Sequence, residues 1–356
     1  MEENNSDKLI KEFLIVGAGL SGICMAIHLI KKGHKIRLID SGENFSSKIA
    51  AGQINPLVFR RMTKSWRVDE FLPYAENFYT DLGIDTNTNI YYPIQIRRMF
   101  SSSHEKVMWL EKQNRDGFSD YLETITEEDD NYNLAQNDFG SGRIKKSSYV
   151  HAINFLEAGK KWISKRGDIE TEKMDYATIN PTDSIYKNKK YDFILFCEGS
   201  QNSDNPWFNQ FIIEHTKGEV LTIKSTEISQ NESLNRKCFL LPVGGNLFRL
   251  GATYIWNTPE RSITEEGKND LLEKIKLLTY KPFEVVDQKA GIRPTTPDRR
   301  PIIGKHPNFN NLLIFNGLGT KGYLMAPLLA KEFSDYLENK GELDKEVRIE
   351  RLLKKE

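Results

Sequence analysis

The sequence predicts a two-domain α/β fold (α+β in its second domain), in which a Rossmann-like domain with a parallel sheet carries an inserted domain built on an antiparallel sheet. Three observations predict this class. The chain opens with a strand, a glycine-rich turn, a helix and a second strand. Two later apolar runs, Tyr191–Phe196 and Leu312–Phe315, are typical of buried parallel strands. Between them, short strands are joined by a glycine turn, which is typical of an antiparallel sheet.

The opening of the chain predicts a βαβ unit. After a polar start at Met1–Asp7, we expect a strand at Glu12–Val16, a helix at Leu20–Lys32 and a strand at Lys35–Ile39. The run Phe13–Ile30 carries no charge and is about long enough to span a bilayer, so a membrane anchor is the alternative. Three glycines interrupt the run and no small-residue cleavage site follows it, which favours a strand, a turn and a buried helix.

The middle of the chain changes character and predicts an insertion. In order, we expect a helix at Arg67–Leu82, an extended stretch at Asn89–Phe100, a helix at Ser103–Gln113 and an acidic, Asn-rich loop at Glu127–Gly142. A further helix is expected over Ser147–Lys165, because Tyr149, Ile153, Leu156 and Trp162 can share one helical face.

The second half predicts an antiparallel sheet, then a closing strand and helix. The expected elements are strands at Gly218–Lys224, Cys238–Val243 and Leu247–Tyr254, a hairpin turn at Gly244–Asn246, a helix at Thr264–Leu278, a strand at Leu312–Phe315 and a helix at Gly322–Leu337. We therefore expect residues 1–66, 143–204 and 293–356 to form the first domain, and residues 67–142 and 205–292 to form the inserted domain.

The strongest single motif is Gly17-Ala18-Gly19-Leu20-Ser21-Gly22, which lies between the first expected strand and helix. In this context Gly17 allows a tight turn, Gly19 lets backbone amides approach a pyrophosphate, and Gly22 lets the helix pack on the strand. Asp40 follows at the end of the second strand, about 20 residues later, where a carboxylate accepts hydrogen bonds from an adenosine ribose. The motif predicts a bound dinucleotide.

Two later runs favour a flavin over a nicotinamide dinucleotide. The small residues within Ser46–Gln53 would let backbone amides approach a flat ring system. The run Asn316–Gly322 leads from a strand into a helix, whose N-terminal dipole can stabilise the negative charge of a reduced flavin.

Taken in order, the motifs of the chain resemble those of the D-amino-acid oxidase/glycine oxidase-like family of FAD-dependent oxidoreductases. The motifs are Gly17–Gly22 with Asp40, Ala50–Gly52, Phe196–Gly199, Gly251–Tyr254, Gly291–Pro294, Thr296–Asp298, Pro301–Gly304 and Asn316–Gly322. The resemblance covers nearly the whole chain and implies an FAD-binding domain made of discontinuous segments, together with an antiparallel-sheet substrate domain.

The motifs and the resemblance together identify the expected FAD-binding residues. These are Gly17, Gly19, Leu20, Ser21, Gly22, Asp40, Ser41, Ala50, Ala51, Gly52, Gln53, Gly199, Gly317, Gly319, Thr320, Lys321 and Gly322. The sarcosine-oxidising branch of the family carries an attachment cysteine near the element that corresponds to Gly291–Gly304. This chain has none there, so we expect non-covalent FAD.

Arg293 and Tyr254 are the expected catalytic residues. The guanidinium of Arg293 is a permanently charged fork that matches a carboxylate, and the resemblance implies that role for it. The alternative is a structural ion pair with Asp287 or Asp298. Tyr254 is expected to orient the amine or the carboxylate, with simple packing as its alternative. Lys321 is a candidate for contact with the flavin or for aiding reaction with oxygen, and a surface position is its alternative.

These residues predict oxidation of the C–N bond of a small amino acid or secondary amine that carries a carboxylate. Hydride would pass to flavin N5 and the imine would hydrolyse, with hydrogen peroxide as a product if oxygen accepts the electrons. An electron-transfer acceptor would make the protein a dehydrogenase instead. One alternative is an oxidase of a carboxymethylaminomethyl-modified tRNA uridine, and another is a noncatalytic flavin-binding subunit. A candidate basic patch for RNA consists of Arg60, Arg61, Lys64, Arg67, Arg97 and Arg98.

Composition narrows the remaining classes. The 356 residues include 50 Lys and Arg against 50 Asp and Glu, so net charge gives no case for nucleic-acid or anionic-membrane binding. The three cysteines and six histidines lack the paired spacings of a disulfide framework or a metal site. We expect no metal, and a cytoplasmic, bacterial protein.

Overall fold

A computed structural model of the chain describes residues 9–43, 45–126, 132–211, 213–256, 258 and 260–353. The expected polar start at Met1–Asp7, and residues 127–131 of the expected acidic loop, lie outside these residues. The chain divides into two compact units. Unit 1 comprises Met1–Asn44, Leu156–Glu214 and Pro294–Glu356, and unit 2 comprises Phe45–Phe155 and His215–Arg293.

Unit 1 is built on a six-stranded sheet in the order β10-β2-β1-β14-β21-β20. Its strands are β1 (Glu12–Val16), β2 (Lys35–Asp40), β10 (Asp168–Thr171), β14 (Phe193–Phe196), β20 (Ile302–Lys305) and β21 (Leu312–Asn316). All neighbours pair in parallel except β20 and β21, which are antiparallel. The expected opening and the two returning strands are confirmed, because β1 lies between β2 and β14, and β21 follows β14.

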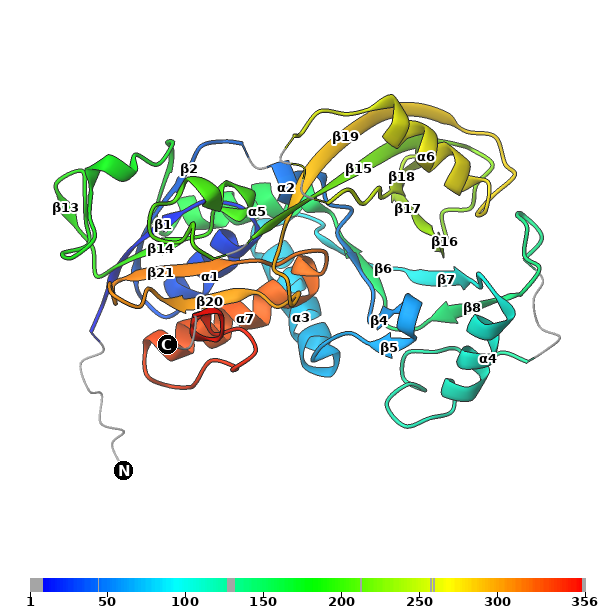
Figure 1. Cartoon of the computed structure of the whole chain (residues 1–356), viewed down its shortest axis with the longest axis horizontal. Coiled ribbons are helices and arrows are strands. Elements are labelled where there is room, and N and C mark those ends of the chain that lie inside the picture. The colour runs from blue at the N-terminus through cyan, green and yellow to red at the C-terminus, as the bar shows by residue number, and fades with distance from the viewer. Residues whose placement is uncertain are drawn as a thin grey trace. The chain divides into compact units, whose positions relative to one another are not determined.

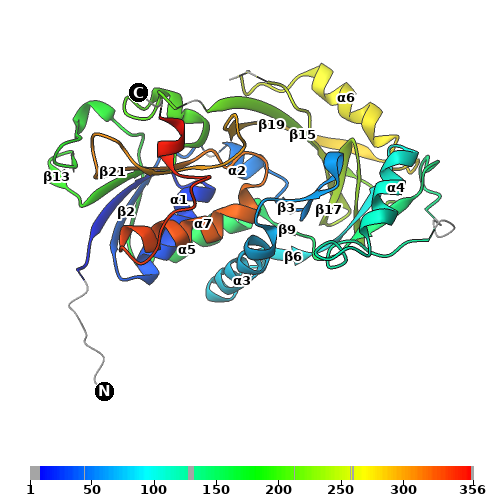
Figure 2. The same cartoon turned by 60° about the horizontal axis from the view of Figure 1, so that its bottom comes forward.

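Three helices pack side by side in unit 1 (Figure 2): α1 (Leu20–Lys31), α5 (Ala152–Ser164, in unit 1 from Leu156) and α7 (Gly322–Leu337). Gly159 of α5 comes so close to α1 that a Cβ there would lie 2.4 Å from Ile23. The rings of Phe315 in β21 and Phe333 in α7 are 6.5 Å apart, so α7 packs on the sheet face that carries Phe315. No helix among the described residues is long and apolar enough to cross a membrane.

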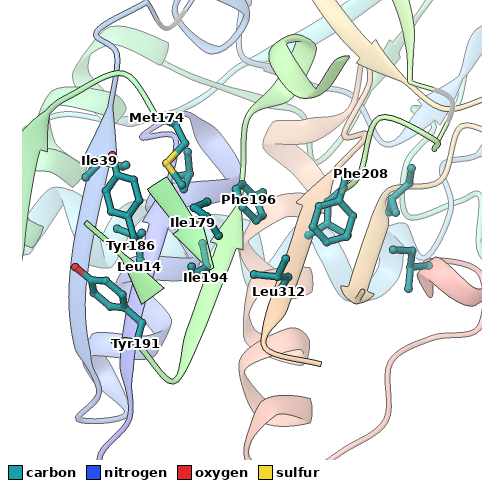
Figure 3. Packing of buried hydrophobic residues seen from close by; sticks show 14 of the residues in the cluster. Leu14, Ile39, Met174, Ile179, Tyr186, Tyr191, Ile194, Phe196, Phe208 and Leu312 are labelled. Carbon is teal, nitrogen blue, oxygen red and sulfur yellow. The ribbon is translucent and has the colours of Figure 1, made fainter. Parts of the chain in front are cut away.

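The face of this sheet opposite to Phe315 carries a cluster of buried side chains (Figure 3). Leu14, Ile194, Phe196 and Leu312 point from neighbouring strands, and Tyr186 and Tyr191 lie beside them. Strand side chains alternate between faces, which is why Leu14 and Ile194 belong to this cluster while Phe13 and Phe315 do not. The rest of unit 1 consists of the small sheet β11 (Ile179–Asn180), β12 (Ile185–Tyr186) and β13 (Lys189–Lys190), with the 3-10 helices η2 (Tyr176–Thr178), η3 (Gly199–Asp204) and η4 (Ile349–Leu352).

Unit 2 is built on a seven-stranded sheet in the order β19-β15-β18-β17-β16-β7-β8. Its strands are β7 (Gln95–Met99), β8 (Ser141–Ile144), β15 (Glu214–Lys224), β16 (Glu232–Arg236), β17 (Cys238–Gly244), β18 (Leu247–Gly251) and β19 (Glu284–Thr295). The expected hairpin between β17 and β18 is confirmed, and its Gly244, Gly245 and Asn246 all have positive φ, at 89°, 62° and 62°.

Helix α6 (Glu265–Ile275) covers one face of this sheet (Figure 1), because Leu271 and Ile275 share a buried cluster with Leu221 and Ile223 of β15. By strand alternation, Gly218 and Thr222 of β15 point to the opposite face, which we call the second face.

Smaller elements complete unit 2. They are α2 (Phe45–Ile49), β3 (Gln53–Ile54), β4 (Leu57–Val58), η1 (Phe59–Arg61), β5 (Thr63–Lys64), α3 (Val68–Thr86), β6 (Tyr91–Pro93), α4 (Ser103–Lys112) and β9 (Ser148–Val150). Strand β9 pairs with both β3 and β6. This pairing holds residues 45–66 and 143–155 in unit 2, whereas the sequence-based boundaries placed them in the first domain. Residues 205–214 lie in unit 1 and Arg293 lies in unit 2, again in the opposite part to the one that the sequence-based boundaries gave.

Two expected elements are shorter in the structure than the sequence predicts. The helix expected over Ser147–Lys165 begins only at Ala152, and Tyr149 lies in β9, where its ring stacks on Tyr92 at 4.8 Å. Long-range strand pairing has overridden the helical spacing. The strand expected over Leu247–Tyr254 ends at Gly251, where the amide of Glu219 donates to the hydroxyl of Thr253. Pairing with β15 resumes one residue out of register, at the bridge between Lys217 and Ile255.

Candidate functional site

The first candidate site is the glycine turn between β1 and α1 in unit 1. Gly17 has φ +101°, and a Cβ there would lie 2.5 Å from the carbonyl oxygen of Cys197. A Cβ at Gly22 would lie 1.8 Å from the carbonyl oxygen of Gly17. Both obstacles are backbone atoms, so the turn requires glycine at both positions.

Helix α1 begins at this turn without a side-chain cap. Its N-cap residue is Gly19, which has no side chain to accept a hydrogen bond from the first turn, and that turn contains no acidic residue. The helix is almost entirely buried, including Leu20 and Ser21. Its N-terminal partial charge therefore suits an anion such as a pyrophosphate.

Asp40 lies at the end of β2 and contacts the same turn. One carboxylate oxygen accepts a hydrogen bond from the amide of Ala18 at 2.6 Å, and the other accepts from the amide of Gly42 at 2.8 Å. Lys160 of α5 lies 3.7 Å from the carboxylate. Asp40 therefore holds the glycine turn in place, and its contact with a ribose stays a prediction. The neighbouring Ser41 accepts a weak hydrogen bond from the amide of Glu43.

The loop between β21 and α7 closes on the same edge of the sheet. The side chain of Asn316 donates to the carbonyl of Gly199, just after β14, at 3.0 Å. Gly317 has φ +75°, and the amide of Gly319 donates to the carbonyl of Pro294 at 2.9 Å. A Cβ at Gly322 would lie 2.9 Å from the side chain of Leu20, so α7 begins against the start of α1. The loops after β1, β14 and β21 thus meet where parallel sheets bind ligands.

Lys321 is the N-cap residue of α7, and Thr320 before it is exposed. The side chain of Lys321 is partly covered, and burial lowers its pKa to about 8. Because the side chain is partly exposed, its contact with the flavin stays a prediction.

In unit 2, the run Ser46–Gln53 forms α2 and the start of β3. The hydroxyl of Ser46 donates to the carbonyl of Ile292, and a Cβ at Gly52 would lie 1.9 Å from the carbonyl oxygen of Val150. The side chain of Gln53 donates to Ser233 at 2.7 Å. Ala50 and Ala51 are partly exposed. The close approach of Val150 explains why position 52 needs glycine, and the contact of this run with FAD stays a prediction.

The second candidate site surrounds Arg293 on β19. Its guanidinium lies against β15 at Gly218, where a Cβ would come within 2.1 Å of Nη2. It donates only long hydrogen bonds, of 3.4 Å to the carbonyl of Lys217 and of 3.4 and 3.5 Å to the carbonyl of Thr253. We call Lys217, Gly218, Thr253, Tyr254 and Arg293 the arginine cradle.

Among the described residues, no carboxylate lies within ion-pair distance of Arg293. Asp287 pairs with Lys289 at 3.0 Å and Asp298 pairs with Arg351 at 2.8 Å, so neither expected alternative partner is engaged with it. Burial lowers the pKa of Arg293. A desolvated guanidinium of this kind favours an external anion, because protein carbonyls satisfy its hydrogens only weakly.

Tyr254 is not a packed core residue, since 43% of it is exposed. The guanidinium carbon of Arg293 lies 5.3 Å from the centre of its ring, a cation–π distance, and Trp256 meets the same ring edge-on at 4.9 Å. Tyr254 therefore flanks the guanidinium, although it lies beyond the end of β18.

Sequence reasoning missed the support of this cradle. Lys217 and Glu219 form an ion pair at 3.0 Å with exposures of 2% and 0%. The Glu219 carboxylate also accepts from both the amide and the hydroxyl of Thr264, and from the side chain of Gln288. The only local signal was two charges that flank a glycine just before the mainly apolar run Val220–Ile223.

The candidate basic patch is largely neutralised by ion pairs. Its pairs are Lys64 with Asp69, Arg67 with Glu70, Arg97 with Glu232 and Arg98 with Glu105. Within the part of the chain that the structure describes, only Arg60 and Arg61 of this set have no ion pair, and both are exposed.

The cysteines offer no reactive thiolate. Cys24, Cys197 and Cys238 are free and buried, and burial raises the pKa of each. The described residues contain no group of three His, Cys, Asp or Glu side chains placed to hold a metal.

Comparison with known families decides which dinucleotide the glycine turn serves. Residues 12–336 match the DAO family, described as FAD-dependent oxidoreductase. This chain belongs to that family. It is therefore an FAD-dependent oxidoreductase, and the resemblance stated from its motifs is confirmed.

Several proteins resemble this FAD-dependent oxidoreductase over most of its length. A glycine oxidase of Bacillus licheniformis is 24% identical, covering 91% of this chain and 92% of the relative. The tRNA 5-methylaminomethyl-2-thiouridine biosynthesis bifunctional protein MnmC of Legionella pneumophila (strain Corby) is 25% identical over 83% of this chain, which spans only 46% of that relative.

Solved structures show the same fold. The iminodiacetate oxidase of Chelativorans sp. BNC1 superposes with a TM-score of 0.80 at 16% identity, covering 96% of this chain and 98% of the other. The glycine oxidase of Bacillus cereus ATCC 14579 gives a TM-score of 0.78 at 22% identity, covering 93% and 96%. The expected two-domain fold class is confirmed.

Proposed function

We propose that this enzyme oxidises the C–N bond of a small amino acid or secondary amine whose carboxylate binds Arg293. The observation that carries the proposal is a partly buried guanidinium that no carboxylate of the described residues neutralises. Oxidases of glycine and of iminodiacetate, both carboxylate-bearing amines, are among the relatives and structural neighbours.

The residues of unit 1 fit FAD. The N-terminus of α1, whose N-cap residue is a glycine, suits the pyrophosphate, and the glycines at 17 and 22 leave a turn that any side chain would obstruct. Asp40, at the end of β2, would accept hydrogen bonds from the ribose, and the loop Gly317–Gly322 would offer the N-terminus of α7 to the flavin. Because every cysteine is buried with a raised pKa, the protein offers no obvious attachment thiolate, which supports non-covalent binding.

The protein's own residues would bind and orient the substrate. Arg293 would hold the carboxylate by paired charge-assisted hydrogen bonds, and Tyr254 would limit its movement from the side. FAD, when bound, supplies the hydride acceptor, and the imine product hydrolyses in water. A strong general base is unnecessary if the amine reacts in its neutral form, which agrees with the lack of a histidine in the cradle.

The test is anaerobic reduction of the FAD-loaded enzyme by an amine panel. Glycine, sarcosine, proline, D-amino acids and other N-substituted glycines are each mixed with the enzyme, and flavin absorbance is followed. We expect at least one carboxylate-bearing amine to bleach the flavin. A protein that binds FAD but is reduced by none of these compounds would contradict the proposal. Reoxidation with oxygen or with an artificial acceptor then distinguishes an oxidase from a dehydrogenase.

The second candidate function is oxidation of a modified tRNA uridine, which the similarity to the bifunctional tRNA-modifying relatives favours. Against it, four of the six residues of the basic patch are engaged in ion pairs, so little free positive charge remains for phosphates. Flavin bleaching by carboxymethylaminomethyl-modified tRNA, without bleaching by any small amine, would favour this function. The flavin of a noncatalytic subunit would be bleached neither by the modified tRNA nor by a small amine. We also propose that the protein is cytoplasmic.

A further inference from the structure

A second arginine lies on the second face of the unit 2 sheet. Arg249 of β18 pairs with Thr222 of β15 in the strand register, and its guanidinium donates to the Thr222 hydroxyl at 3.0 Å. The side chain is half-buried, and burial lowers its pKa. No carboxylate of the described residues lies within ion-pair distance of it. Asp287 is close enough to raise its pKa, but pairs with Lys289.

Arg249 and Arg293 share this face. The guanidinium of Arg293 lies at Gly218, and that of Arg249 at Thr222. Gly218 and Thr222 are an even number of residues apart along β15, so both point to the second face, whereas Leu221 and Ile223 point to α6. Two partly desolvated cations without protein counter-ions therefore lie along one strand.

The spacing of these cations selects a ligand size. Four residues of a strand span about 13 Å, so we take guanidinium groups that lie at Gly218 and at Thr222 to be about that far apart. A carboxylate carbon lies about 4 Å from the guanidinium carbon that binds it, so two bound carboxylates would be separated by about 5 Å. That is the separation of two carboxylates joined by a –CH2–NH–CH2– bridge in its extended form.

We propose that Arg249 binds a second carboxylate of the substrate, so that the preferred substrates are N-carboxyalkyl amino acids with two carboxylates. This inference rests on the proposed function, in which Arg293 binds the first carboxylate. Asp287 faces the same region from β19, but Lys289 neutralises it, so the face keeps its positive charge. Arg249 thereby acts on the choice of substrate and not on the bond that is oxidised.

The inference is tested by binding of two unreactive thioethers to the FAD-loaded enzyme, measured by calorimetry. Thiodiacetate has two carboxylates at the required spacing and no amine to oxidise, whereas (methylthio)acetate has one carboxylate. We expect thiodiacetate to bind about tenfold more tightly or better, since a charge-assisted hydrogen bond is worth at least that factor. Arg249→Met should remove this preference while leaving (methylthio)acetate binding unchanged, and Arg249→Lys should restore part of it.

Lys224→Met is the matched control, because it removes one exposed positive charge from the same face at the end of β15. It should change the preference by less than about twofold, as a screened surface charge does. Equal binding of both thioethers to the wild type, or an equal loss of both in Arg249→Met, would overturn the inference.

Failure of the proposed function has a different signature. Arg293→Met should weaken both thioethers, and if it weakens neither, the first carboxylate site itself is wrong. With the active enzyme, Arg249→Met should lower kcat/KM for iminodiacetate about tenfold or more relative to sarcosine, mainly through KM. If Arg249→Met left the ratio of kcat/KM for iminodiacetate to kcat/KM for sarcosine unchanged, that result would also overturn the inference.

Discussion

In unit 1, a Cβ added at Gly17 or Gly22 would meet backbone atoms. In unit 2, a Cβ added at Gly218 would meet the end of the flexible Arg293 side chain. The glycine turn is one continuous run of residues, and main-chain atoms, including the carbonyl oxygen of Cys197, fix its shape. The arginine cradle is assembled from three separate segments, and a movable guanidinium sets its shape. A site of the first kind tolerates almost no change. A site of the second kind can change its ligand preference while the fold persists.

Replacing Gly22 with Ala should break the unit 1 site with the largest effect. The Cβ would lie 1.8 Å from a carbonyl oxygen, so strand and helix must move apart. We expect a loss of about 4 kcal/mol in the free energy of unfolding, at the upper end of overpacking effects. FAD should no longer copurify. Urea unfolding and the visible spectrum measure both.

The control is Gly291→Ala on β19, where a Cβ would make ordinary contacts of 3.5 Å with Ile49. It should unfold like the wild type. If Gly22→Ala also unfolded like the wild type, backbone crowding would not explain the glycine turn.

The next largest effect on stability is expected at the buried Lys217–Glu219 ion pair, which supports the arginine cradle. Glu219→Gln removes the counter-charge of buried Lys217, and we expect a loss of about 3 kcal/mol. Burial alone would raise the pKa of Glu219, but its hydrogen bonds with Thr264, Lys217 and Gln288 outweigh burial and lower it. This contribution is therefore present at neutral pH and is lost as pH falls through the lowered pKa.

Glu265→Gln on the exposed side of α6 is the comparison for that variant, because its pair with Lys268 is open to solvent. Denaturant unfolding at pH 7 should separate the two by more than 2 kcal/mol. Indistinguishable midpoints would mean that the Lys217–Glu219 pair does not stabilise unit 2.

Gly218→Ala should sharpen the contrast between the units. Its Cβ displaces the Arg293 guanidinium instead of the main chain, so the free energy of unfolding should fall by less than about 1 kcal/mol. KM for a carboxylate-bearing amine should rise about tenfold, equivalent to one misplaced charge-assisted hydrogen bond. Steady-state kinetics and urea unfolding of the same preparation are needed. An unchanged KM would remove Gly218 from the cradle.

The smallest effect is a pH dependence at Lys321. Burial lowers its pKa to about 8, so between about pH 8 and pH 10 the unfolded chain binds the proton and the folded chain does not. The wild type should therefore gain stability across this window relative to Lys321→Met. We expect about 1 kcal/mol, because partial exposure screens the charge.

Lys331→Met serves as the control on the same helix, since Lys331 is half exposed and pairs with Asp335. Removing Lys321 should change the pH dependence of stability in this window more than removing this second lysine does. An equal pH dependence of the two variants would show that burial does not lower the pKa of Lys321.

The glycine turn was accessible from sequence because its parts are neighbours and their spacing encodes their roles. Helix α7 and strand β1 were likewise predicted to the residue. Tyr149 was assigned to a helix because its local spacing is helical, and only pairing with distant strands places it in β9. Gly218 was missed because nothing near it in sequence reports that a side chain from residue 293 will lie against it.

The central claim is that Arg293 binds the substrate carboxylate, and its most direct test is a ratio of rates. Anaerobic flavin reduction by sarcosine and by dimethylamine, which lacks the carboxylate, is measured for the wild type and for Arg293→Met. We predict that the wild type prefers sarcosine by at least about 100-fold, and that the variant loses this preference while retaining FAD. A variant that keeps the wild-type preference would contradict the account.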